Sequence, residues 1–175
     1  VMKTRFDPFK QEPIPQASVL CYVLRKIVNS DETRQVKLLE IFEDHPRMIV
    51  FYSFDYERDI LKSIYYGEDV AVAEYSGHAH EAIPETAKWV YLVNYSSGAE
   101  GFNCIKTDCI VFWSQTYSYK TLLQACGRID RLNTPFVDLY YYHIKSHSPI
   151  DLAISRALKQ KKKFNERNFA NWDGR

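Results

Sequence analysis

The segment from Gln124 to Arg131 carries side chains that could bind phosphate. Gln124, Arg128 and Arg131 are spaced at i, i+4 and i+7, which on a helix places all three on one face. Guanidinium groups form planar, bidentate hydrogen bonds with phosphate oxygens, so two arginines and an amide on one face would make a clamp with several donors. The alternative from these residues alone is a surface ladder of ion pairs that involves Asp130.

A second candidate feature is the loop at 94–103, with the sequence NYSSGAEGFN, which holds two of the six glycines in the chain. Glycine and small hydroxyl residues let backbone N–H groups approach an anionic oxygen. Open parallel sheets bind ligands at the carboxyl ends of their strands, so the residues directly after each predicted strand matter most. These include Ser53, Ser76 with Gly77, and Ser96. Without further context, a loop of this composition is also typical of an ordinary turn.

The elements that must position these residues alternate along the chain. Helical apolar spacing is present at 16–29, and Ser30 and Asp31 predict the cap of a second helix. Its inward-facing residues are predicted to be Val36, Leu38, Leu39, Ile41 and Phe42. Short apolar runs predict strands, and strands separated by helices predict an α/β fold with a parallel sheet covered by helices on both faces. Further helices are predicted at 55–65, 119–129 and 150–164, and strands at 48–52, 70–74, 89–93, 109–113 and 137–143.

The chain is the length of one ordinary domain, with 175 residues and 46% hydrophobic residues. Neither an internal repeat nor a low-complexity tract interrupts it. We therefore expect a single domain at 16–165, preceded by an extended, proline-containing entry segment at 1–15 and followed by a tail at 166–175. The absence of a long apolar run or a signal-like start predicts a cytoplasmic protein with no membrane contact.

The net charge of +1 excludes a strongly basic nucleic-acid wrapper, so any contact with nucleic acid must come from a local patch. Charge is unevenly spread along the chain. Residues 55–85 hold eight acids and two bases, a net of −6, whereas residues 151–175 hold seven bases and three acids, a net of +4. The two segments are either solvated faces or an acidic surface kept away from phosphate and a basic one available to it.

The cysteines and histidines predict no metal site. Cys21, Cys104, Cys109 and Cys126 form no C-x-x-C pair, and no histidine pair has a cysteine beside it. Reduced, mostly buried thiols are the expected state of these cysteines in a cytosolic protein.

Four segments in order carry a resemblance to a known family. Residues 48–54, 75–77, 96–103 and 124–131 resemble motifs four, four-a, five and six of superfamily two helicases. The pattern Q-x-x-G-R-x-x-R is the most specific, and it follows a G-x-E-G-x-N loop. The resemblance covers residues 16–165 and is similar in character to Swi/Snf-type translocases and phage-encoded helicases, which implies a bacterial or phage-infected host cell.

The resemblance implies the second RecA-like lobe of a nucleic-acid-dependent ATPase, which closes on ATP and Mg²⁺ held mainly by a first lobe. Carried onto matching positions, Arg131 is the arginine finger, Arg128 a second phosphate contact and Gln124 an orienting group. The residues that match motif five, which touches nucleotide and nucleic acid, are Gly98, Glu100, Gly101 and Asn103. The candidates for contact with a DNA or RNA backbone are Ser53, Ser76, Gly77 and Ser96.

The chain has no G-x-x-x-x-G-K-[ST] loop, which cradles the β- and γ-phosphates in such enzymes. The implied partner is therefore an N-terminal RecA-like lobe of the same parent protein, and the isolated chain is expected to be inactive. The competing hypothesis is a non-catalytic RecA-like docking module that uses the same clamp to bind an acidic or phosphorylated partner.

Overall fold

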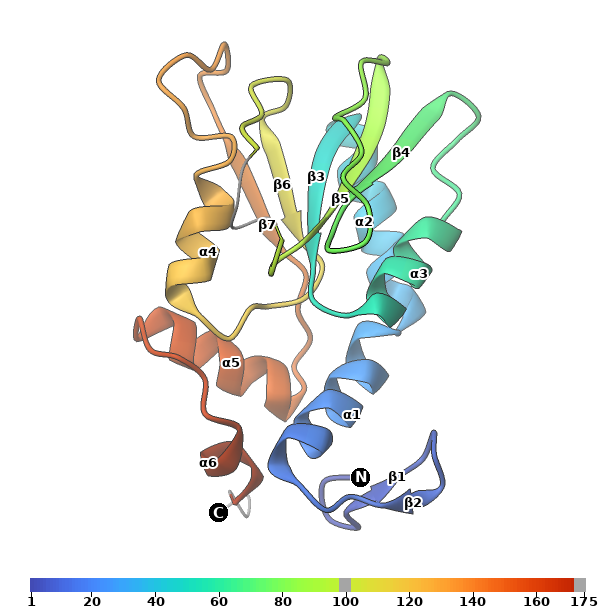
Figure 1. Ribbon diagram of the computed structural model, residues 1–175, viewed down its shortest axis with the longest axis vertical. Coiled ribbons are helices and arrows are strands. Elements are labelled where there is room, and N and C mark those ends of the chain that lie inside the picture. Colours follow the sequence, from blue (N-terminus) through green and yellow to red (C-terminus); the bar gives the residue numbers. More distant parts are fainter. Residues whose placement is uncertain (98–101, 172–175) are drawn as a thin grey trace.

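A five-stranded parallel sheet forms the centre of the computed structural model, which describes residues 1–97 and 102–171. The strand order is β4-β5-β3-β6-β7 (Figure 1). Ile49 of the central strand lies opposite Tyr91 on one side and Ile110 on the other. The strands are β3 (Arg47–Tyr52), β4 (Val70–Tyr75), β5 (Lys88–Asn94), β6 (Cys109–Phe112) and β7 (Tyr140–His143).

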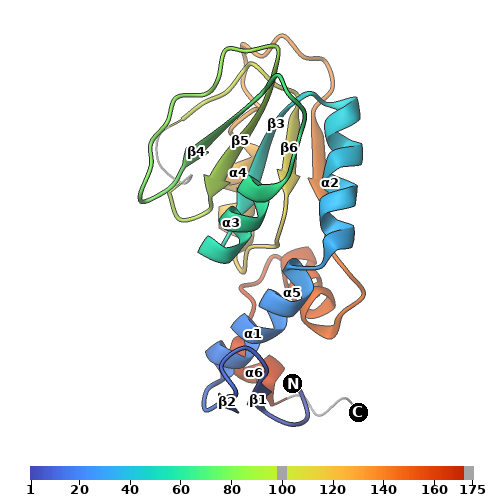
Figure 2. The ribbon, with the colours of Figure 1, turned by 90° about the vertical axis from the view of Figure 1, so that its right-hand side faces the viewer.

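Helices cover both faces of the sheet, which confirms the predicted α/β, RecA-like architecture (Figures 1 and 2). Helices α2 (Glu32–Asp44) and α3 (Asp55–Ser63) pack on one face, and α4 (Tyr119–Cys126) packs on the other. Strand β3 is apolar without interruption because alternate side chains enter two different cores. Val50 packs with α2 and α3, whereas Phe51 packs on the side of α4.

The predicted cap of the second helix is present in the structure. Asp31 is the N-cap of α2, and its carboxylate accepts a hydrogen bond from the backbone N–H of Thr33 at 2.9 Å. Leu38, Ile41 and Phe42 are buried against the sheet, as predicted, and Leu39 is partly buried beside them. The prediction that Val36 faces inward is wrong, because its side chain is 58% exposed.

A second layer lies beyond the carboxyl ends of the strands, at the bottom of Figure 1. It consists of α1 (Ala17–Asn29), α5 (Pro149–Lys159), α6 (Glu166–Ala170) and a hairpin of β1 (Phe6–Asp7) and β2 (Glu12–Pro13). Cys21 of α1 packs with Ile154 of α5 and Phe169 of α6. The entry segment thus contains a hairpin, and the segment predicted as a tail contains a helix that packs on α1.

Most element bounds differ from the prediction by one or two residues, and three differ by more. The helix predicted at 119–129 ends at Cys126, because the chain tightens there into turns in which Arg128 N–H bonds the carbonyl of Ala125 at 3.1 Å. The helix predicted at 150–164 ends at Lys159, after which Phe164 turns back into the core. Strand β7 begins at Tyr140 rather than 137, and Val137 is 98% exposed.

Within the described residues, no helix combines the length and the apolar character that crossing a bilayer requires.

Candidate functional site

Arg128 lies in the turn after α4 and is largely buried, with 9% exposure. Its Nη1 donates a hydrogen bond to the carbonyl oxygen of Phe102 at 3.0 Å, and its guanidinium lies 5.6 Å from the centre of the Phe102 ring. The backbone of Arg128 is also held in place, because the N–H of Cys104 donates to the carbonyl of Arg128 at 2.9 Å. These contacts hold the arginine against the end of the 94–103 loop.

Arg131 shares this region with Arg128. Burial lowers the pKa of Arg128 below its usual value, and the positive charge of Arg131 lowers it further. The Nε of Arg131 is buried and has no hydrogen-bond partner among residues 1–97 and 102–171. The positive charges of the two arginines therefore act on each other, and the binding of a phosphate group by the pair stays a prediction.

The ion-pair ladder considered from the sequence does not form in the described part of the chain. There, no ion pair links Asp130 to Arg128 or Arg131, although several ion pairs form elsewhere. The ladder is therefore not supported by the described residues, and the phosphate clamp stays a prediction.

The geometric basis of the predicted clamp is nevertheless wrong in one respect. Only Gln124 lies on α4, where it is exposed, because the helix ends before Arg128 and Arg131. The arginines come together through the turn that follows the helix and not through a shared helical face. Gln124 as an orienting group stays a prediction.

Aromatic rings form the wall beside the arginine pair. The Phe102 ring lies 5.5 Å from Tyr75, the last residue of β4, and 5.5 Å from Tyr91 of β5. Tyr75 also stacks on His80 at 4.7 Å. The arginine pair is therefore placed on the α4 side of the sheet, near the carboxyl end of β4.

Loops after three neighbouring strands also lie close together. Asn94 donates a hydrogen bond from Nδ2 to the carbonyl of Ser53 at 3.3 Å, and its Oδ1 accepts from the backbone N–H of Ser96 at 2.9 Å. A Cβ on Gly77 would lie 3.9 Å from the hydroxyl of Ser97. The structure thus brings together the predicted backbone-contact residues after β3, β4 and β5.

The hydroxyl groups of these serines differ in availability. Ser96 is exposed, but Ser76 is buried and its Oγ accepts from the N–H groups of His78 and Ala79 at 3.2 and 3.3 Å. The Oγ of Ser53 accepts from Arg25 at 3.2 Å and lies 3.2 Å from the Oγ of Ser114. Ser76 is therefore buried and Ser53 is half-buried, and the hydroxyls of both take part in hydrogen bonds within the protein.

Three of the four motif-five positions, Gly98, Glu100 and Gly101, lie outside the described residues. The fourth, Asn103, is exposed and lies between Phe102, which contacts Arg128, and Cys104, which is bonded to the backbone of Arg128.

A buried polar network beneath the Ser53 loop was missed by the sequence analysis. Glu57 has no exposed surface and accepts hydrogen bonds from Ser53 N–H at 2.7 Å, Ser114 Oγ at 2.8 Å and Asn29 Nδ2 at 2.8 Å. Burial lowers the pKa of nearby Arg25, but Glu57, Tyr117 and Tyr56 together outweigh this effect, so the pKa of Arg25 is raised. The network fixes the loop after β3 to α1.

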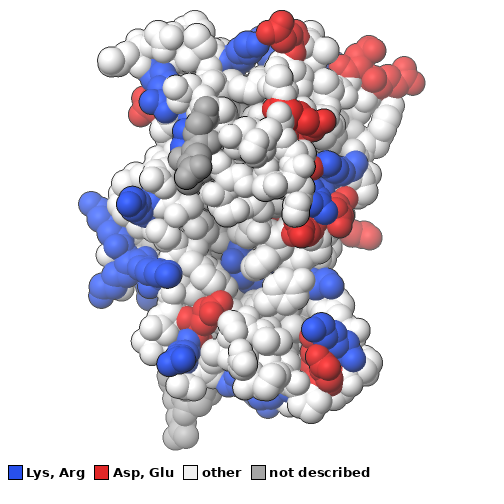
Figure 3. Space-filling view, viewed as in Figure 1, with Lys and Arg blue, Asp and Glu red and all other residues white. Residues whose placement is uncertain are grey.

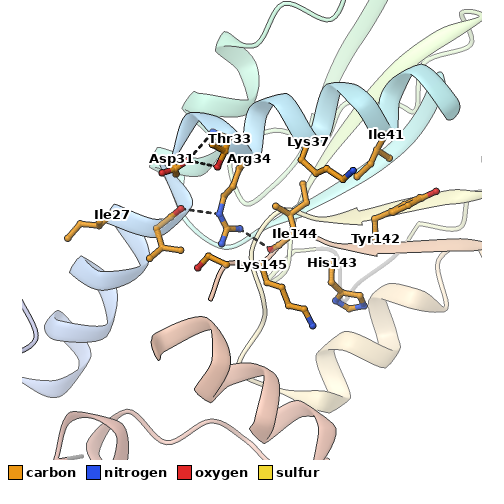
Figure 4. Close-up of a pocket in the computed structure, with 12 residues that line it drawn as sticks. Ile27, Asp31, Thr33, Arg34, Lys37, Ile41, Tyr142, His143, Ile144 and Lys145 are labelled. Carbon is orange, nitrogen blue, oxygen red and sulfur yellow. Dashed lines mark hydrogen bonds between the residues drawn. The ribbon is translucent and has the colours of Figure 1, made fainter. Parts of the chain in front are cut away.

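A second buried network joins α2 to α5 and was also missed. Figure 4 shows the Arg34 side of it, with the hydrogen bond from Arg34 to the carbonyl of Ile144. The side chains of Arg34 and Asp151 are each 5% exposed and form an ion pair of 2.6 Å. Arg34 also donates to the carbonyls of Val28, Trp113 and Ile144 at 3.0, 2.7 and 2.9 Å. The sequence signal for this network was Arg34 itself, a charged residue that lies four positions before Leu38 on the inward face of the helix.

A solved structure is similar in fold to most of this chain. A crystal structure of the C-terminal part of the Fun30 ATPase domain is similar to this chain, with a TM-score of 0.59 and 14% sequence identity. The match covers 75% of this chain and 46% of that chain, so the present chain spans less than half of its length. Neither a protein-family model nor a curated protein matches the sequence. At this identity the likeness establishes a shared fold: that of the C-terminal part of an ATPase domain.

Proposed function

We propose that this chain is the C-terminal lobe of a nucleic-acid-dependent ATPase, a helicase or translocase. The observation that carries the proposal is the convergence of Arg128 and Arg131 beside the 94–103 loop, on a RecA-like sheet. Arg128 is buried, Arg131 is half-buried, and the charge of Arg131 acts on Arg128. We expect such a pair to meet an anion that a second lobe presents.

In this function, Arg131 is the finger that meets the γ-phosphate of ATP, and Arg128 is a second phosphate contact that also anchors the loop. Phosphoryl transfer spreads negative charge over the γ-phosphate oxygens, and an arginine delivered from another lobe neutralises that charge when the lobes close. The buried, unpartnered Nε of Arg131 supports this role, because a guanidinium needs donors to spare for a new ligand. ATP and Mg²⁺ would be held mainly by the first lobe, in the same parent protein.

The nucleic-acid backbone would be met by the joined loops after β3, β4 and β5. Ser96 and Gly77 are the surface members of this group, and Ser53 and Ser76 act by holding the loop backbones in place. Backbone N–H groups in such loops contact phosphates without reading sequence.

The isolated chain tests this proposal directly. Because the sequence has no phosphate loop, we expect the 175-residue protein to hydrolyse ATP no faster than buffer, with or without DNA or RNA. The measurement is phosphate release at saturating ATP and Mg²⁺. Hydrolysis stimulated by nucleic acid in this chain alone would contradict the half-enzyme proposal.

The docking-module hypothesis makes a different claim about the same arginines. A module that binds an acidic or phosphorylated partner would lose affinity for that partner when Arg131 is changed, and no ATP turnover in the parent protein would depend on it. Turnover in the parent therefore separates the two functions.

A further inference from the structure

The face of α5 that points to solvent forms one side of a basic hollow. The hollow has a volume of about 380 Å³ and is lined by Lys145, Ser146, His147, Ser155, Arg156 and Lys159, together with Leu152. The two lysines and Arg156 are exposed, and no acidic residue lines the hollow. It lies beyond the carboxyl end of β7, apart from the arginine pair beside Phe102.

The charges of this hollow are not neutralised within the described residues. There, Lys145, Arg156 and Lys159 take part in no ion pair. The carboxylate on α5, Asp151, is buried on the inward side and is already bound to Arg34. Figure 4 shows Lys145 in the segment after β7, beside the backbone that Arg34 holds.

The row of cations continues past the end of α5. Lys161, Lys162 and Lys163 are exposed, and the Nζ of Lys161 lies 5.8 Å from the centre of the Tyr119 ring. Lys161 has a φ of 56°, and its N–H bonds the carbonyl of Leu158 at 2.9 Å, which makes it the left-handed residue that ends the helix. Lysine costs stability at this position relative to glycine, because its Cβ crowds the left-handed backbone.

Figure 3 shows where the basic and the acidic residues lie on one face of the molecule. Lys and Arg gather on the left of the view, on the side where α5 lies in Figure 1, whereas most Asp and Glu lie on the right. The acidic residues include Asp55 and Asp59 of α3. A polyanion is therefore attracted to one flank of the molecule and repelled from the other.

We propose that this hollow and the lysines that follow it bind the phosphodiester backbone of a nucleic acid. A nucleic acid presents phosphates in a regular series, which fits a row of cations that extends from Lys145 to Lys163. An isolated phosphate would instead need a closed site with several donors on one group. This surface is separate from the arginine pair and gives the nucleic acid a contact beyond the joined loops.

Hydrogen bonds connect this surface to the Ser53 loop. Ser155 donates from Oγ to Oε1 of Gln115 at 2.6 Å, and Arg25 donates from Nη2 to the carbonyl of Gln115 at 2.8 Å. Arg25 also donates from Nη2 to the Oγ of Ser53 at 3.2 Å. A backbone bound along α5 would therefore rest on a rigid part of the structure that also fixes one of the strand-end loops.

The test uses the double variant Arg156→Gln with Lys159→Gln and its matched control, Arg47→Gln with Lys88→Gln. The control also removes one arginine and one lysine, both exposed, but at the amino ends of β3 and β5. Fluorescence anisotropy with a labelled mixed-sequence oligonucleotide gives the affinity at several salt concentrations. We expect the test variant to bind about tenfold more weakly at low salt and the control to stay within about twofold of wild type.

The salt dependence gives an independent reading. Two lost phosphate contacts should reduce the slope of log affinity against log salt by about 1.4 on single strands and about 1.8 on duplex. Poly-glutamate of matched length should bind more weakly than the oligonucleotide. Equal losses in the two variants, an unchanged slope, or equal binding of poly-glutamate would each overturn the proposal. Turnover of the parent enzyme with Arg131→Ala does not enter this test, so the two proposals fail separately.

Discussion

Arg131→Ala in the parent protein, which also carries the first lobe, is expected to reduce nucleic-acid-stimulated ATP turnover by at least about 100-fold. An arginine finger is typically worth about 10³–10⁵ in turnover, because it neutralises charge that develops in the transition state. A surface ion pair at the same position would be worth about 0–1 kcal/mol of stability and nothing in turnover. ATP affinity should be largely kept, so the loss appears in kcat.

The controls for this result are Arg131→Lys and Arg58→Ala. Lysine should not restore turnover, because a point charge cannot reproduce the planar fork of a guanidinium. Arg58 is an arginine on α3 that pairs with Asp55 and Asp59 at the surface, and its removal should leave turnover within about twofold. If Arg131→Ala retains turnover within a few-fold of the parent, the finger assignment is wrong and the docking module is favoured.

Arg128→Ala is a less clean experiment than Arg131→Ala. Its side chain anchors the carbonyl of Phe102, so its removal changes the loop as well as the charge. We expect a similar or milder loss of turnover, accompanied by lower stability, and a stability measurement must accompany the kinetic one.

Arg34→Met should lower the free energy of unfolding of this chain by about 3–5 kcal/mol. The change leaves the carboxylate of Asp151 buried without its cation and removes donors from the carbonyls of Val28, Trp113 and Ile144. Breaking one side of a buried pair is costly because the remaining charge has lost its water and its partner. Urea denaturation monitored by circular dichroism measures the change.

Arg58→Met is the matched control for stability, since it makes the same substitution at a partly exposed arginine. A change within about 1 kcal/mol is expected there. A loss below about 1 kcal/mol in Arg34→Met would show that the pair joining α2 to α5 is not the support that its geometry indicates.

The positions of the strands along the chain were predictable because they depend on local patterns. Runs such as 48–52 are apolar throughout, and only a strand covered on both faces explains such a run between helices of amphipathic spacing. The cap at Asp31 was predictable for the same reason, since an N-cap needs only its own side chain and the N–H groups that follow.

The ends of α4 and α5 were not predictable, because contacts from distant residues decide them. The helical spacing of apolar residues continues through Ile129. The helix nevertheless ends earlier, and the carbonyl of Arg128 accepts a hydrogen bond from the N–H of Cys104. Likewise Phe164 fits the helical period, yet it packs on Tyr117, with ring centres 4.8 Å apart, and its N–H bonds the carbonyl of the same residue. A local pattern carries no information about these partners.

The candidate site was likewise predictable from the sequence only in part. The residue types at 124–131 predicted a phosphate clamp, and the structure brings two of the three members together, although by a turn and not by a helix. The roles of Ser53 and Ser76 could not be read from their position after a strand, because hydroxyls that bond inside the protein look the same in sequence as hydroxyls that face solvent.

The most direct test is a structure of the parent protein bound to ADP and a fluoride analogue of the γ-phosphate in the transition state, with nucleic acid present. The account predicts that the guanidinium of Arg131 lies within hydrogen-bonding distance of the analogue, about 3 Å, with Arg128 beside it. A closed structure in which another residue contacts the analogue and Arg131 faces solvent or a protein partner would contradict it.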